Sequence, residues 1–183
     1  MQQRTITLTC SIGLVLLFVC NTAVAQYELT NLVSNQEGVA KHDDPLIVNA
    51  WGLVHGPGTS WWVSDNLSGW STLYNAGGVK QGLVVEIPTV TGGGVGSPTG
   101  VVFNGTSDFK VNGQSTFFIF ATLDGTISTF TPSVDLNNAL IQVKKAGAVY
   151  TGLAITNNAA GNLLFAANNG ENRVDVYNGS FQR

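Results

Sequence analysis

A short pattern occurs three times in this chain, at nearly equal intervals. Gly52, Gly100 and Gly152 are each followed by two apolar residues, and they are spaced by 48 and 52 residues. After each glycine comes an apolar segment that ends in small or polar residues, and then a segment in which polar and apolar residues alternate. The alternating segments close on the aromatic residues Tyr74, Phe130 and Tyr177. The chain is therefore built from one unit used repeatedly.

Self-similarity at 40 to 50 residues, with four short strands in each unit, is typical of propeller blades. The repeats lie near 49–88, 97–143 and 149–183, and the last has room for three strands. We therefore predict an all-β fold, with residues 26–183 forming about three four-stranded blades of an incomplete ring, six blades being expected for the whole. An open array of three repeats and a sandwich of similar strands are the alternatives.

The order of small and large residues favours this arrangement. The innermost strand of a blade is crowded near the axis, so a glycine suits its start. An inner strand that is buried on both sides should read as an apolar run, as 152–155 does. Asp124-Gly125, between two strand-like segments, predicts a hairpin with a type I′ turn.

The segment before the first repeat predicts one more strand. Residues 27–33 alternate between polar and apolar side chains, and 34–48 are polar and irregular, with a turn expected at His42–Pro45. In many propellers an N-terminal strand completes the last blade. Three blades do not close a ring, so we expect the natural protein to continue beyond Arg183.

The N-terminus predicts an export signal over residues 1–25. Arg4 precedes an apolar run over 6–19, and Ala23-Val24-Ala25 is a cleavage site of the small-x-small type. The expected location is secreted or extracytoplasmic, with no stable membrane insertion after cleavage. An uncleaved N-terminal membrane anchor and a lipid anchor on Cys20 are the alternatives, although the apolar run is shorter than the ~20 residues that span a bilayer.

Composition narrows the classes of function. Cys10 and Cys20 both lie in the export signal, so the mature chain has no disulfide and no thiol chemistry. Without Arg4, seven basic residues face eleven acidic ones, a net charge near −4. This balance disfavours binding to nucleic acid.

The repeats also carry a resemblance to known proteins. Asn-Ala-Trp-Gly-Leu at 49–53, Trp-Trp-Val-Ser-Asp-Asn at 61–66 and Gly-Ser-Pro-Thr-Gly-Val-Val-Phe-Asn at 96–104 look like segments of a family of secreted bacterial proteins of uncharacterised function with predicted propeller domains. The resemblance covers about 27–183. More loosely, Asn-Arg-Val-Asp-Val-Tyr at 172–177 is similar to the blades of NHL-type and gluconolactonase-like propellers.

The gluconolactonase-like resemblance implies a possible metal site. In those propellers, Asp, Asn and Glu near the central tunnel hold a divalent cation, and oxygen ligands suit Ca²⁺. Asp65 and Asn66 are the candidate ligands here, but the corresponding positions are Thr122-Leu123 and Ala167-Asn168, so no acidic residue recurs. We therefore predict no cofactor, with Ca²⁺ as the alternative. The simpler interpretation is that Asp65 and Asn66 cap a turn.

Three further residues are candidates for ligand binding. Asn49 lies where the chain enters an inner strand, and Trp61 and Trp62 could stack on sugar rings. A turn residue and aromatic packing between blades are the ordinary alternatives. No catalytic residue is assigned, because the sequence shows no nucleophile elbow, no phosphate-binding loop and no CxxC.

We therefore expect an exported, non-enzymatic scaffold that binds an unknown protein or glycan. The alternatives are a metal-assisted hydrolase or lactonase of the gluconolactonase-like type, and a carbohydrate-binding module built on the tryptophan cluster. Fold similarity does not decide between these functions.

Overall fold

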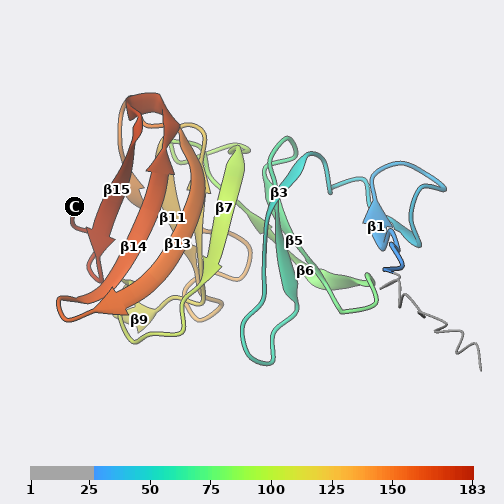
Figure 1. Ribbon diagram of the computed structural model, residues 1–183, viewed down its shortest axis with the longest axis horizontal. Coiled ribbons are helices and arrows are strands. Elements are labelled where there is room, and N and C mark those ends of the chain that lie inside the picture. The colour runs from blue at the N-terminus through green and yellow to red at the C-terminus, as the bar shows by residue number, and fades with distance from the viewer. Residues whose placement is uncertain (1–26) are drawn as a thin grey trace, which may run out of the picture.

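The computed structural model describes residues 27–183 and consists mainly of antiparallel sheets, with almost no helix. The predicted all-β class is confirmed. The predicted export signal at 1–25, with Cys10 and Cys20, lies outside the described residues. Figure 1 shows three larger sheets, coloured from cyan through yellow to red in chain order.

The first sheet is a four-stranded antiparallel meander in the order β3-β4-β5-β6. Its strands are β3 (Ala50–Val54), β4 (Trp61–Asp65), β5 (Trp70–Tyr74) and β6 (Lys80–Glu86). β-Branched and aromatic residues fill the strands, whereas Gly69 and Gly78 occupy positive φ in the two turns that follow β4 and β5.

The second and third sheets repeat this plan. The second sheet has the order β7-β10-β11-β12, and the third has β13-β14-β15. Their strands are β7 (Pro98–Phe103), β10 (Phe118–Thr122), β11 (Thr126–Phe130), β12 (Leu140–Lys144), β13 (Tyr150–Asn158), β14 (Gly161–Asn168) and β15 (Arg173–Asn178). A short 3-10 helix, Asn169–Glu171, joins β14 to β15.

Two small sheets complete the described chain. β1 (Val33–Ser34) pairs in parallel with β2 (His42–Asp43), and β8 (Lys110–Val111) pairs with β9 (Gln114–Ser115). The prediction of a strand over residues 27–33 is therefore mostly wrong. Residues 27–32 form no strand, and Tyr27 is 93% exposed, although the carbonyl oxygens of Asn31 and Leu32 accept hydrogen bonds from the backbone nitrogens of Lys41 and His42.

The hairpin at Asp124-Gly125 is present, but its turn is not type I′. Gly125 has φ +81° while Asp124 is not among the residues of positive φ, and three residues separate β10 from β11. This is the common longer loop in which only the last position is left-handed. Gly125 also lies under Lys145, where a Cβ would come within 2.3 Å of a carbonyl oxygen.

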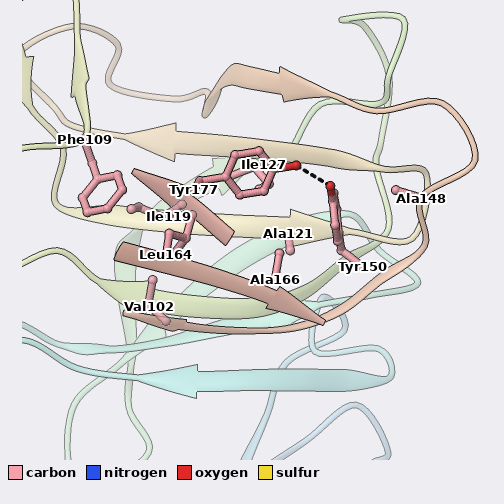
Figure 2. Close-up of a cluster of buried hydrophobic side chains, with 10 residues drawn as sticks. All are labelled: Val102, Phe109, Ile119, Ala121, Ile127, Ala148, Tyr150, Leu164, Ala166 and Tyr177. Atoms are coloured by element: carbon pink, nitrogen blue, oxygen red, sulfur yellow. Dashed lines mark hydrogen bonds between the residues drawn. The ribbon is translucent and has the colours of Figure 1, made fainter. Parts of the chain in front are cut away.

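Two apolar cores hold the three sheets together. Between the first and second sheets, Trp62 stacks on Phe118 with ring centroids 4.1 Å apart, and Phe120 and Phe130 pack beside them. Between the second and third sheets lies the cluster drawn in Figure 2, which includes Ile119 from the second sheet. The second sheet is therefore apolar on both faces, and it lies between its two neighbours.

The first strands of the three sheets lie side by side. β7 contacts β3 on one side and β13 on the other (Figure 1). The approach is close at the glycines, since a Cβ on Gly52 would lie 2.5 Å from the Thr99 carbonyl oxygen, and one on Gly100 would lie 2.4 Å from the Leu153 nitrogen. Only glycine leaves room for these contacts.

Candidate binding surface

The structure brings Asn49 and Asn66 together. The Asn49 side-chain amide donates to Asn66 Oδ1 over 3.1 Å, and the Asn66 side chain donates to the Pro98 carbonyl oxygen over 3.0 Å. Asn49 adopts φ +53°, a left-handed conformation that asparagine tolerates. The two amides thus connect the loop before β3, the end of β4 and the start of β7, which is a structural use of both side chains.

Asp65 points away from Asn66 and into the protein. Its side chain is fully buried, and its Oδ2 accepts hydrogen bonds from the Thr72 nitrogen (3.1 Å) and hydroxyl (2.7 Å). Its Oδ1 has no partner among the described residues. Burial raises the pKa of Asp65 to about 7, and the two Thr72 hydrogen bonds offset only part of that shift.

A second buried carboxylate lies nearby on the face of the first sheet that is turned away from the second sheet. Asp44 accepts hydrogen bonds from the Tyr74 hydroxyl at 2.6 Å and from Lys80 Nζ at 2.8 Å. Burial pushes the pKa of Asp44 upward, but these bonds and one from the Leu46 nitrogen outweigh it and hold the pKa below its usual range. Asp44 therefore anchors the N-terminal segment to the sheet as an ion.

The described residues contain no cluster of side chains that could bind a metal ion. Within residues 27–183, no three His, Cys, Asp or Glu side chains gather closely enough to hold an ion. Asp65 and Asn66, the predicted weak candidates, are engaged with Thr72 and Pro98 instead.

The two adjacent tryptophans lie on opposite faces of β4. Trp62 is buried in the core against the second sheet, and Trp61 is 37% exposed on the other face, with its ring 4.3 Å from that of His55. Trp51, on β3, is 45% exposed. Trp61 and Trp51 are therefore available for contact, whereas Trp62 is a core residue.

Trp51 and Trp61 line a cavity of about 480 Å³ on the first sheet. Sequence reasoning identified Trp61 but missed most of the other lining residues: Leu32, Val33, Ile47, Ala50, Gly52, Leu53, Val63, Tyr74, Asn75, Ala76 and Gly78. Alternation in β4 places Trp61 and Val63 on one face and Trp62 on the other, but which residues of the N-terminal segment line the cavity depends on tertiary packing. The polar side-chain groups of the lining are the Asn75 amide, the Tyr74 hydroxyl and the indole N–H groups of the two tryptophans, and the other side chains are apolar, so the cavity suits an apolar surface.

We call the side of β3–β6 that carries Leu53, Trp61, Val63 and Tyr74 the outer face of the first sheet. Cross-strand pairing places Leu53 opposite Val63, and Trp61 opposite Tyr74, so these side chains project from one side. Leu53 is 62% exposed. Trp61 is also exposed, whereas Val63 and Tyr74 are buried, and Asp44 of the N-terminal segment contacts the Tyr74 hydroxyl.

Among residues 27–183, no helix is long and apolar enough to cross a membrane.

No family model matches this chain. Two curated relatives are uncharacterised proteins of Acanthamoeba polyphaga mimivirus, L690 and R648. They are 29% and 27% identical to this chain over 169 residues, which cover 88% of the chain in both cases. The shared region amounts to 44% of the first relative and 41% of the second, so the chain spans about two fifths of their length.

These relatives correct the family resemblance. The expected membership of a secreted bacterial family with NHL-type or gluconolactonase-like blades is wrong, because the relatives are viral and no family model supports that family. The short motifs misled because they reflect what any stack of small antiparallel sheets requires: glycine at close approaches, and aromatics between faces.

Proposed function

We propose that residues 27–183 are part of an exported β-propeller that acts as a non-enzymatic binding scaffold. Three features support the ring-like arrangement: sheets stacked in chain order, first strands side by side, and a glycine at each close approach. In a propeller, such strands surround the axis and successive blades pack face to face. The proposal of export depends on the export signal predicted over residues 1–25.

The contact surface of this scaffold is the outer face of the first sheet. The observation that carries this proposal is the 480 Å³ apolar cavity, with Leu53 and Trp61 exposed beside it. Burying such side chains is favourable by roughly 25 cal/mol per Å² of apolar surface. A partner with an apolar surface is therefore the expected ligand.

A glycan is the second candidate ligand, and the exposed rings of Trp51 and Trp61 favour it. Flat aromatic faces pack against sugar C–H groups, but a sugar site also needs several convergent polar side chains. Among the cavity residues, Asn75 is the one amide side chain available for that purpose. The apolar partner is accordingly the better fit.

The test is a titration of the dye 1-anilinonaphthalene-8-sulfonate into dilute protein spanning residues 27–183. We expect the dye to fluoresce on binding the outer face, and Leu53→Ser to weaken this response. Leu136→Ser is the matched control, since Leu136 is 63% exposed against 62% for Leu53 and lies in the loop between β11 and β12. An equal response from both variants would refute the proposed contact surface.

A further inference from the structure

The outer face of the first sheet already carries part of its own chain. Residues 31–45, which we call the strap, contact this face, and Figure 1 shows the segment, in blue, on the side of the first sheet away from the second. Leu32 and Val33 of the strap line the cavity together with side chains of the sheet. The strap is therefore one wall of the candidate binding surface.

Polar side chains, rather than an apolar core, hold the strap to the sheet. Asp44 is the single buried residue of the strap. Its carboxylate accepts hydrogen bonds from the Tyr74 hydroxyl at 2.6 Å and from Lys80 Nζ at 2.8 Å. The His42 ring also lies 3.2 Å from the Gly77 carbonyl oxygen. A segment with so few buried apolar contacts separates from the rest of a fold at a low cost in free energy.

The backbone of the strap forms its hydrogen bonds within the strap. β1 pairs with β2, and the nitrogens of Lys41 and His42 donate to the carbonyl oxygens of Asn31 and Leu32. Among the described residues, no backbone hydrogen bond joins the strap to β3–β6. The strap can therefore leave the sheet as a unit without exposing an unpaired backbone group.

The chain is fixed to the sheet directly after the strap. The Ser68 hydroxyl donates to the Leu46 carbonyl oxygen over 2.5 Å, and the Leu67 nitrogen donates to the Val48 carbonyl oxygen over 3.2 Å. Both bonds attach residues 46–48 to the turn between β4 and β5. The strap thus has a fixed end at residues 46–48 and a body that Asp44 attaches to the sheet.

We propose that the strap covers part of the outer face until the apolar partner of this surface displaces it, and that Asp44 is the group that holds it closed. The inference rests on the proposed function, since it describes how the same surface is regulated. Asp44 belongs to the strap and Lys80 to β6, so the ion pair joins the cover to the sheet. A partner displaces the strap only if its contacts with the uncovered face offset the loss of these bonds.

The first experiment treats the purified protein with a low concentration of trypsin and follows cleavage after Lys41 by mass spectrometry. Lys41 is an exposed residue of the strap, and cleavage there follows the population of the open strap when opening and closing are fast. Asp44→Ala should raise this rate roughly tenfold or more, because the lost hydrogen bonds involve a charged group. Lys80→Met should raise it by a smaller factor, since the bond from the Tyr74 hydroxyl remains.

The matched control is Lys145→Met. It breaks an ion pair of similar length, 2.6 Å to Glu171, outside the first sheet. Cleavage after Lys41 should keep its wild-type rate in this variant. Circular dichroism shows whether each variant keeps its fold, and Lys80→Met carries the test if Asp44→Ala unfolds.

The second experiment measures the affinity for 1-anilinonaphthalene-8-sulfonate, because the closed strap competes with the dye for the outer face. Asp44→Ala and Lys80→Met should bind the dye more tightly than the wild type, since a larger fraction of the protein is open. A cleavage rate or a dye affinity that neither variant changes would overturn the strap.

Leu53→Ser distinguishes the failure of the strap from the failure of the contact surface. If Leu53→Ser weakens the dye response while the Asp44 and Lys80 variants change nothing, the strap is refuted and the proposed function stands. If Leu53→Ser leaves the dye response unchanged, the contact surface is refuted, and with it the role of the strap as its cover.

Discussion

The hydroxyl oxygens of Tyr150 and Tyr177 lie 2.6 Å apart in the core between the second and third sheets (Figure 2). The Tyr150 hydroxyl also lies 3.1 Å from Asp175 Oδ2, to which it donates. Tyr150 is on β13 and Tyr177 on β15, so the pair spans the third sheet from its first strand to its last. Burial and these neighbours raise the pKa of Tyr150, so the hydroxyl remains a donor at all physiological pH values.

Tyr150→Phe should destabilise the protein by about 1 to 3 kcal/mol, because it leaves the Tyr177 hydroxyl and Asp175 with one buried partner fewer. Urea denaturation measures the loss. Tyr27→Phe is the control, since Tyr27 is 93% exposed and should change nothing. Equal stability of Tyr150→Phe and the wild type would show that water replaces the lost hydroxyl.

Trp62→Ala should lower the free energy of unfolding by about 3 to 5 kcal/mol. It removes the ring that packs on Phe118 and Phe130 and leaves a cavity between the sheets. Trp61→Ala, one residue earlier, changes an exposed side chain and should cost far less. Thermal melts of the two variants measure the difference. Similar losses would contradict the assignment of the two rings to opposite faces.

The stability of the protein should fall as pH rises from about 4 to about 7. Burial raises the pKa of Asp65 from 3.8 to about 7, so the folded protein binds a proton that the unfolded chain has released over this range. Over the whole range, the free energy of unfolding should fall by on the order of 4 kcal/mol. The lowered pKa values of Asp44 and Asp175 act in the opposite direction, but below pH 4, where these carboxylates become protonated.

The measurement is the urea denaturation midpoint at about pH 5 and about pH 8. Asp65→Asn removes the titrating group and should flatten the difference between the two values. Glu28→Gln, in the exposed N-terminal segment, is the control and should leave the difference unchanged. A steep pH dependence that survives Asp65→Asn would assign the effect to another group.

Gly52→Ala and Gly100→Ala should each destabilise the fold by about 1 to 3 kcal/mol, because the added Cβ overlaps backbone atoms of the next sheet. Gly152→Ala should be nearly neutral, because a Cβ there meets only the Ala167 methyl, at 4.0 Å. Melting temperatures rank the three variants. A ranking that puts Gly152 with the other two would show that the third sheet has a hidden close contact.

Much of the strand pattern could be predicted from the sequence, because local residue alternation determines it. The alternating segments that close on Tyr74, Phe130 and Tyr177 correspond to strands β5, β11 and β15. Alternation alone could not predict whether residues 27–33 form a strand, since an alternating segment becomes a strand only when it pairs with the edge of a sheet. Residue preference does not reveal whether such an edge exists.

The candidate surface was predicted only in part. Trp61 stood out as a large aromatic, but Leu53 and Val63 are ordinary strand residues whose exposure depends on what covers the sheet. Asp65 was a candidate metal ligand through the gluconolactonase-like resemblance, and the sequence does not give the direction of a side chain at a strand end. The hydrogen bonds from Thr72, seven residues later, decide that direction.

The packing of consecutive sheets has a consequence for how the chain folds. β7 packs on β3 and β13 packs on β7, so the contacts between sheets join residues about one repeat apart. Closing loops of this length costs less entropy than joining the ends of the whole chain. Each repeat can therefore pack onto a finished predecessor as it leaves the ribosome, and assembly would proceed from the N-terminus one sheet at a time.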